Sequence, residues 1–154
     1  MRTLIDRLPL LALGLGCFAL APPAGASLGA DSGSVEADRA ALHGEIAVGS
    51  AAGFEVREIT TPSGVHIREY LAASGKVFAL SWQGPVRPDL RQILGTYYAD
   101  YARAAAASHV GGHRHLAVQI PGLVVESNGR MRAFYGRAWD PALLPAHFQV
   151  ADLR

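Results

Sequence analysis

The sequence predicts an α+β domain, an antiparallel β-meander of about five strands with one long amphipathic helix packed on the sheet. Three observations lead to this expectation. Three turns share one glycine-containing chemistry, the residues around the first turn form complementary cross-strand pairs, and one later segment carries apolar residues at helical spacing. The chain has 154 residues, and with its N-terminal signal removed it suffices for one core but hardly for two domains.

The chain begins with the pattern of a secretory signal peptide. Arg2 and Arg7 give a positively charged region ahead of the apolar run "LPLLALGLGCFAL", and Ala24-Gly25-Ala26 offers the small residues that signal peptidase requires. The run is too short for a membrane span, which needs about 20 apolar residues. We expect a signal peptide at 1–26, cleavage after Ala26, export to the periplasm or beyond, and no membrane span afterwards. An uncleaved anchor and lipidation of Cys17 are the alternatives.

Residues 27–53 are rich in alanine, glycine and serine. The segment "SVEADRAAL" is compatible with a short helix that Ser34 would cap, because a serine oxygen can accept a hydrogen bond from a free N–H group of the first turn. We therefore expect a flexible N-terminal arm or one short helix here, followed by a single α+β domain at 54–154.

Turns divide the next part of the chain into strands. In "TPSGV", "AASGK" and "ESNGR" a glycine follows two turn-forming residues, and glycine adopts positive φ without steric cost. Hairpin loops need such a position, and "NG" is a strong hairpin signal. We expect strands at 54–61, 65–72, 76–83, 122–127 and 130–138.

The first two turns also predict a register. A loop at 62–64 creates three cross-strand pairs that stabilise a sheet: Ile59 with Ile67, Arg57 with Glu69, and Glu58 with Arg68. A loop at 73–75 places Tyr70 opposite Phe78 and Leu71 opposite Val77. One face of the sheet would then carry Phe54, Val56, Tyr70, Phe78, Leu80 and Trp82, and the other Ile59, Val65, Ile67, Leu71, Val77 and Ala79.

The segment "RPDLRQILGTYYADYARAAAASH" is the expected helix. Its apolar stripe consists of Leu90, Ile93, Leu94, Tyr97, Tyr98 and Tyr101. Asp89 would cap its start, with Gln92 completing a capping box. Gly95 inside the helix indicates close approach to the sheet, unless it is merely tolerated. The tail "AWDPALLPAHFQVADLR" is expected to be an irregular strap with a short turn at 141–144.

Three histidines, His109, His113 and His115, lie within seven residues. His113 and His115 would share one face of a strand, and two imidazoles are half of a zinc site. However, Gly111 and Gly112 prevent a helical ligand spacing, and Arg114 places a positive charge between the candidate ligands. We favour a polar loop between helix and strand, and keep a metal site as the alternative.

Other candidate binding residues are arginines and aromatics. Arg130 and Arg132 would share a strand face with Phe134, where guanidinium groups beside an aromatic ring could bind carboxylates, phosphates or sugars. A solvated strand face is the alternative that we favour. The tyrosine stripe is expected to be core rather than a partner surface. The candidate ligand or partner residues are Arg130, Arg132, Trp82, Trp139, Tyr97 and Tyr101.

Charge and motifs exclude several functions. Removal of the signal leaves equal numbers of basic and acidic residues, so nothing draws the mature chain to nucleic acid. It would also lack cysteine, because Cys17 is the only one. The sequence has no Gly-x-Ser-x-Gly, Ser-x-x-Lys, His-Glu-x-x-His or phosphate-loop motif, and we expect no cofactor. Glu58 and Glu69 would lie on opposite faces, each with an arginine that lowers its pKa.

Two blocks of the sequence carry a family resemblance. They are "REITTPSGVHIREYLAASGKVFALSWQGPVRPDLRQILGTYY" and "LVVESNGRMRAFYGRAWDPALLP", and the expected mature start "SLGA" agrees with them. The chain resembles a secreted proteobacterial family known only as domain of unknown function 2844. The resemblance implies export and a small domain but no activity. The stretch from Ala104 to His115 departs from the family pattern, which weighs against the metal site.

Function follows from the expected surface. One helix cannot cover a sheet that is apolar on both faces, and exposed apolar area usually marks an interface. We expect an exported, non-catalytic protein-binding or envelope-associated module that binds a partner protein or a second copy of itself. A metal-binding protein or small metal-dependent enzyme using His109, His113 and His115 is one alternative. Binding of a small anion or a sugar at Arg130 and Arg132 is the other.

Overall fold

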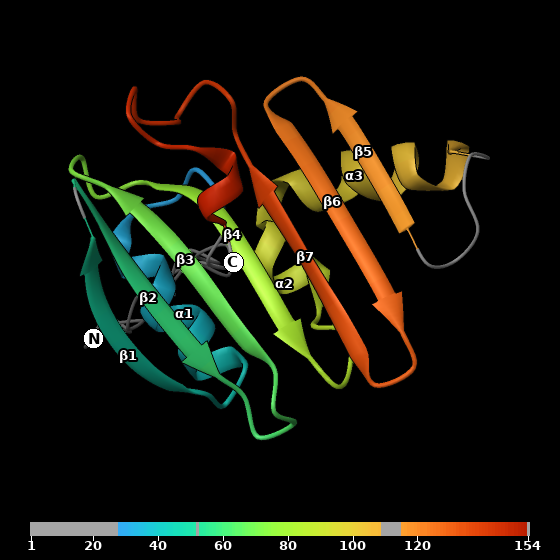
Figure 1. The fold of residues 1–154 in the computed structure, drawn as a ribbon, viewed down its shortest axis with the longest axis horizontal. Helices are drawn as coiled ribbons and strands as arrows, with labels where there is room; N and C mark the ends of the chain where they lie inside the picture. The colour runs from blue at the N-terminus through green and yellow to red at the C-terminus, as the bar shows by residue number, and fades with distance from the viewer. Residues whose placement is uncertain (1–27, 52, 109–114, 154) are drawn as a thin grey trace, which may run out of the picture.

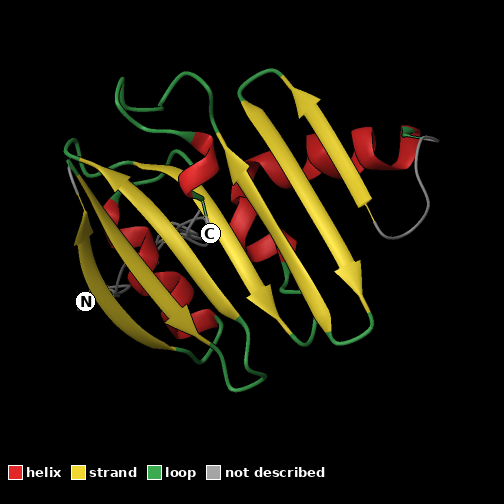
Figure 2. Cartoon of the chain, in the orientation of Figure 1, coloured by secondary structure: helices red, strands yellow, loops and turns green. Residues whose placement is uncertain are grey.

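The computed structural model describes residues 28–51, 53–108 and 115–153. The expected signal peptide, Cys17, His109 and His113 lie outside these residues. The described chain is α+β, with one antiparallel sheet and all three α-helices on the same side of it (Figures 1 and 2). We call this side the helix side. The opposite side, over which the C-terminal residues 140–153 run, is the tail side.

The sheet has seven strands in the order β1-β2-β3-β4-β7-β6-β5, so the expectation of about five was wrong. The strands are β1 Glu45–Ala51, β2 Phe54–Thr60, β3 His66–Ala72, β4 Val77–Gly84, β5 His115–Ile120, β6 Leu123–Arg130 and β7 Ala133–Trp139. The two unexpected strands, β1 and β5, form the edges. The first four strands and the last three are each a local meander, and the two meanders meet where β4 pairs with β7.

The register between β2 and β3 confirms the prediction. Ile59 pairs with Ile67, Arg57 with Glu69, and Glu58 with Arg68. Between β3 and β4, Leu71 pairs with Val77 as expected, but a bulge makes Tyr70 pair with Ala79 instead of Phe78. Because one extra residue reverses the facing of every later side chain, Leu80 and Trp82 belong to the helix side. Their expected place beside Phe54 was therefore wrong.

The hairpin between β6 and β7 turns later than the "NG" signal indicates. Asn128 pairs with Tyr135 inside the ladder, and the chain reverses after Arg130, which pairs with Ala133. Arg132 adopts a φ of 62° there. In this register Val124 pairs with Trp139, Val125 with Ala138, and Glu126 with Arg137. An "NG" turn would have placed Val125 opposite Arg132, so side-chain pairing outweighs local turn preference.

The expected long helix is interrupted. It consists of α2 Leu90–Leu94, the 3₁₀ turn η1 Gly95–Tyr97 and α3 Tyr98–Ala107. Gly95 ends α2 with a φ of 50°, a conformation that glycine adopts readily. Asp89 caps α2 as predicted, accepting a hydrogen bond of 2.9 Å from the N–H group of Arg91. Gln92 does not complete a capping box, because its amide donates to Asp38 instead.

Helix α1 Ser32–Ala41 precedes β1, so the N-terminal stretch at 27–53 holds both a helix and a strand. Asp31 occupies the N-cap position that we expected for Ser34, and the Ser34 hydroxyl donates to the Asp31 carbonyl oxygen. The three helices cover the helix side of the sheet (Figure 1). The core there is formed by Val35, Ile59, Ile67, Leu71, Leu80, Trp82, Ile93, Leu94, Tyr101, Leu123 and Val125, among others.

The tail covers the apolar part of the other side. Phe148 packs against Phe54, Tyr70 and Phe78, with ring centroids 5.2, 5.9 and 4.8 Å away. Trp139 and Leu153 complete this second cluster, and the tail's Leu143, Leu144 and Val150 pack against it. The expected strap is therefore present. The chain itself covers much of the apolar surface that we expected to be left for a partner, although Val48 of β1 stays exposed.

None of the helices in the described ranges is both long enough and apolar enough to span a bilayer.

Candidate ligand-binding site

One half of the tail side is polar and is not covered by the apolar tail cluster. It lies where β2, β4 and β6 end and where β3 and β7 begin, in the lower half of the sheet as drawn in Figure 1. Side chains alternate along each strand, so these residues share a face with Phe54, Tyr70 and Trp139. We call this surface the polar patch: Glu58, His66, Arg68, Ser81, Gln83, Glu126, Asn128, Tyr135 and Arg137.

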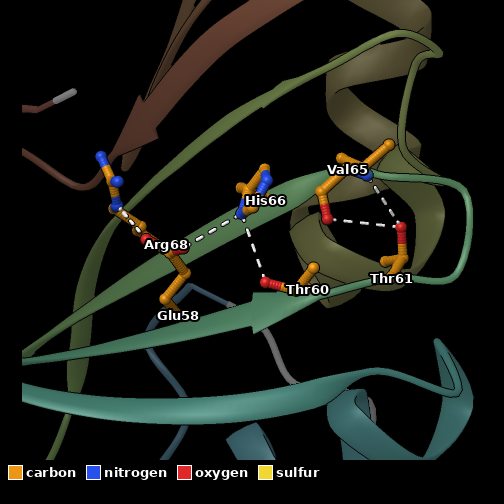
Figure 3. Close-up of polar contacts among 6 residues, drawn as sticks. All are labelled: Glu58, Thr60, Thr61, Val65, His66 and Arg68. Atoms are coloured by element: carbon orange, nitrogen blue, oxygen red, sulfur yellow. Dashed lines mark hydrogen bonds and ion pairs between the residues drawn. The ribbon is translucent and has the colours of Figure 1, made fainter.

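The first part of the polar patch is an ion-pair cluster on β2 and β3 (Figure 3). Arg68 donates from Nε to Oε2 of Glu58, and His66 Nδ1 lies 3.0 Å from Oε1 of the same carboxylate. Thr60 Oγ1 lies 3.2 Å from the same histidine nitrogen. Burial by itself would raise the pKa of Glu58, but the hydrogen bonds and charges of Arg68 and His66 outweigh it and lower that pKa. Glu58 is therefore an ionised acceptor.

A tight turn fixes this cluster. Thr61 Oγ1 accepts a 3.0 Å hydrogen bond from the N–H group of Val65 (Figure 3). The Thr61 N–H group donates to the Val65 carbonyl oxygen. The turn therefore determines which residue of β3 faces Glu58. The sequence predicted the same pairing from the loop at 62–64 and the complementary cross-strand pairs.

The second part of the polar patch lies on β6 and β7. Arg137 donates from Nε to Oε2 of Glu126 at 2.8 Å. Its Nη1 donates to the Val150 carbonyl oxygen of the tail at 2.9 Å, and its guanidinium lies 5.6 Å from the Trp139 ring centroid. Arg137 thus marks the border between the polar patch and the tail.

Two adjacent hollows follow the polar patch across the sheet. One, of about 260 Å³, is lined by Trp82, Gln83, Glu126, Asn128, Tyr135, Gly136, Arg137 and Leu153. The other, of about 180 Å³, is lined by Glu58, His66, Arg68, Ser81, Trp82 and Gln83. Both include Gln83 of β4, so together they extend from β2 to β6.

The chemistry of the hollows is polar but almost neutral. The carboxylates of Glu58 and Glu126 each form an ion pair with an arginine. Beside these pairs the hollows are lined by two amides, Gln83 and Asn128, and by the ring of Tyr135, whose residue is 53% exposed. Such a surface presents donors, acceptors and one aromatic ring while offering little net charge.

The arginines expected at the site lie beside it rather than in it. Arg130 ends β6 and Arg132 occupies the following turn, and both are exposed. The expectation that they share one strand face was wrong, because the hairpin reverses between them. Arg137 and Glu126 are the charged residues that β6 and β7 contribute to the hollow, and the observed hairpin register brings them together.

The aromatic candidates are dispersed. Trp82 packs in the helix-side core, although it also borders both hollows, whereas Trp139 lies on the tail side. Tyr101 is 7% exposed in the helix-side core, and burial raises its pKa. Tyr97 donates a hydrogen bond of 3.1 Å to Asp140, and burial together with that carboxylate raises its pKa.

Of the three clustered histidines, the structure describes His115. It begins β5, is exposed, and its Nδ1 lies 2.7 Å from the side-chain oxygen of Asn128, at the margin of the polar patch. Among the residues described, no three His, Cys, Asp or Glu side chains form a group that could hold a metal ion. Because His109 and His113 lie outside those residues, the metal site stays a prediction.

The sequence did not reveal a buried acidic pair between α1 and the sheet. Glu69 of β3 and Asp38 of α1 are both fully buried on the helix side. Burial, and then the charge of Asp38, raise the pKa of Glu69 to about 9, although Arg57 acts in the opposite direction. Because burial and Asp38 outweigh Arg57, the expectation of a lowered pKa was wrong for Glu69. Its position between Ile67 and Leu71 of the apolar face was the available signal.

Comparison with known proteins identifies a family and little else. The family described as "Protein of unknown function (DUF2844)" matches residues 24–153. No curated protein and no solved structure shows a significant match to the chain.

Proposed function

The chain belongs to DUF2844, a family of proteins of unknown function, and we propose that it is an exported, non-catalytic, envelope-associated binding module. Its binding surface would be the polar patch. The partner would be a polar ligand rather than an apolar protein surface.

One observation carries this proposal. The chain covers the apolar parts of both faces of its sheet, with helices on one side and with the tail on the other. The apolar tail cluster ends at the border of the polar patch, where two hollows gather side chains from five strands. Ligand sites are concave and contain a few placed polar groups that orient the ligand.

The charge states at the polar patch support binding rather than catalysis. A carboxyl group can act as a general acid only where it retains its proton near neutral pH. The pKa of Glu58 is lowered, so this group is ionised. The carboxyl with the raised pKa, Glu69, is fully buried on the helix side and cannot reach a ligand in the hollows.

Export is the second part of the proposal. It rests on Arg2 and Arg7 ahead of the apolar run and on the Ala24-Gly25-Ala26 cleavage pattern. Export would expose the mature chain to the envelope, where its ligand would be found.

Retention of envelope material on the immobilised mature chain tests the proposal. We expect wild type to retain material that a triple variant, Gln83→Ala with Asn128→Ala and Tyr135→Ala, does not retain. A matched control, Val48→Ala with Met131→Ala, removes exposed apolar side chains outside the polar patch and should behave like wild type. Equal retention by the triple variant and wild type would contradict the proposed site.

A further inference from the structure

The polar patch has the chemistry of a site for an uncharged polysaccharide. This inference rests on the proposed function and names the class of ligand. We propose that a chain of neutral sugars lies across β3, β4, β7 and β6, with one sugar ring against Tyr135 and its hydroxyl groups bonded to the planar side chains around it.

The charge of the polar patch argues for a neutral ligand. Arg68 and Arg137, the two arginines of the polar patch, each donate to a glutamate of the neighbouring strand. An anionic ligand would compete with these carboxylates for the guanidinium groups, and a cationic ligand would compete with the guanidinium groups for the carboxylates. A ligand with hydroxyl groups need not compete with either, because an ionised carboxylate retains acceptor capacity and a guanidinium carries five donors.

The geometry favours hydroxyl groups over other neutral groups. Gln83 presents a planar amide with donor and acceptor side by side, and Asn128 adds a second amide, whose oxygen also lies 2.7 Å from His115 Nδ1. The two residues flank Tyr135 in the ladder. Tyr135 pairs with both residues, so an exposed ring lies between two amides. Adjacent hydroxyl groups of a sugar can donate to and accept from one such amide, while the C–H face of the sugar covers the ring.

The same surface is unsuited to a polypeptide. A peptide that extends a sheet needs an exposed strand edge, but β3, β4, β7 and β6 are interior strands whose main chains pair on both sides. A peptide that docks through side chains commonly anchors large residues in well-packed, desolvated pockets. On this side of the sheet the apolar cluster is covered by Phe148 and Leu153 of the tail. A protein partner is therefore an outcome of the test rather than the proposal.

Native gel electrophoresis of the mature chain through gels containing dextran, mannan or galactomannan provides the first test. We expect at least one of these neutral polysaccharides to retard wild type, and a polygalacturonate gel to give no comparable retardation. Titration calorimetry with the matching neutral hexasaccharide then measures affinity. That affinity should change less than about twofold between about 50 and about 500 mM NaCl, because no unpaired charge contributes.

Variants of Tyr135 connect binding to the proposed contact. Tyr135→Ala should weaken binding about tenfold, as expected for loss of a tyrosine that acts as a binding hot spot. Tyr135→Phe keeps the ring and should stay within about threefold of wild type. Gln83→Ala should weaken binding, whereas Val48→Ala should not. Urea unfolding of each variant confirms that the fold is intact.

Two results would overturn the glycan inference. One is the absence of retardation by all three neutral polysaccharides, and the other is binding that Tyr135→Ala leaves unchanged. If envelope material is nevertheless retained through the polar patch, the proposed function stands and the ligand is of another class, a protein included. If retention also fails, the proposed function fails with it.

Discussion

The two sides of the sheet treat similar side chains in opposite ways. Glu69 and Glu58 belong to neighbouring strands, and each pairs in register with an arginine. Glu69 faces the helices, is fully buried near Asp38, and has a pKa raised to about 9. Glu58 faces the open half of the tail side, accepts hydrogen bonds from Arg68 and His66, and has a lowered pKa. Register alone therefore does not determine the charge state of a group, because burial decides it.

The tail side repeats this contrast within one face. Phe148 fills the apolar half, where it contacts three aromatic rings, whereas Tyr135 stands exposed in the polar half. The tail covers the apolar half of this face, which water solvates poorly. The polar half, which water solvates well, stays exposed. Such a surface costs little stability when it is unoccupied, so it can be kept for a ligand.

The largest expected effect is on the covered half. Phe148→Ala should lower the free energy of unfolding by about 3 kcal/mol, because it opens a cavity among buried rings. Tyr135→Ala, on the same side of the sheet, should change it by less than about 0.5 kcal/mol. Urea unfolding measures both. Equal losses would mean that the two halves do not differ as described.

The two glutamates should differ in their response to pH. Glu69 keeps its proton in the folded protein until the pH approaches about 9, but in the unfolded chain it releases the proton near its ordinary value of 4.5. Unfolding therefore releases a proton, and stability falls as the pH rises through this window. Relative to Glu69→Gln, wild type should lose up to about 1.4 kcal/mol per pH unit.

Glu58→Gln is the matched control for that measurement. A lowered pKa gives Glu58 a stabilising contribution that is present above its ordinary value of 4.5 and is lost as the pH falls through the folded pKa. Between pH values of about 6 and 9, its difference from wild type should stay constant. Guanidinium unfolding at a series of pH values supplies both comparisons. A constant difference for Glu69→Gln as well would show that Glu69 is ionised in the fold.

Arg137 joins the two halves of the tail side, so its removal should have an intermediate effect. Arg137→Met breaks the hydrogen bonds to Glu126 and to the Val150 carbonyl oxygen and should cost about 1–2 kcal/mol. Hydrogen exchange should become faster in residues 148–153. Arg103→Met, which breaks an exposed pair with Asp100 on α3, should have little effect on stability. If hydrogen exchange in residues 148–153 were unchanged, Arg137 would not be needed to hold the tail on the sheet.

The smallest expected effect is the coupling between Glu58 and Arg68. Both side chains are partly exposed, at 27% and 40%, so solvent screens their attraction. A double-mutant cycle with Glu58→Gln and Arg68→Met should give about 0.5 kcal/mol. A coupling several times larger would indicate that the pair is shielded from water.

The sequence predicted the parts of the fold that depend on local chemistry. The turn at Pro62-Ser63-Gly64 and two opposite-charge pairs were sufficient to give the register of β2 and β3. Asp89 could likewise be identified as a helix cap, because capping depends on a residue type next to the first helical turn. The edge strands β1 and β5 were missed, because the glycine-containing turns used to locate strands do not bound them.

Long-range packing decided what the sequence could not predict. The bulge after Tyr70 and the late turn at Met131 and Arg132 both place apolar side chains in the cores. In both places the chain departs from the regular ladder or from the turn that the local sequence favours. The site follows the same rule. The pair of Glu58 and Arg68 could be predicted, but its position in one surface with Tyr135 depends on the pairing of β4 with β7. That pairing brings together segments that are far apart in the chain.

The junction of β4 with β7 has a thermodynamic consequence. Gly136 lies there against the Trp82 ring, where a Cβ atom would overlap both that ring and the Glu126 carbonyl oxygen. The larger hollow straddles this junction. A molecule bound in it would contact both meanders at once, and only after they have docked. Occupancy and assembly of the sheet are then linked equilibria, so a saturating ligand would raise the melting temperature by holding the two meanders together.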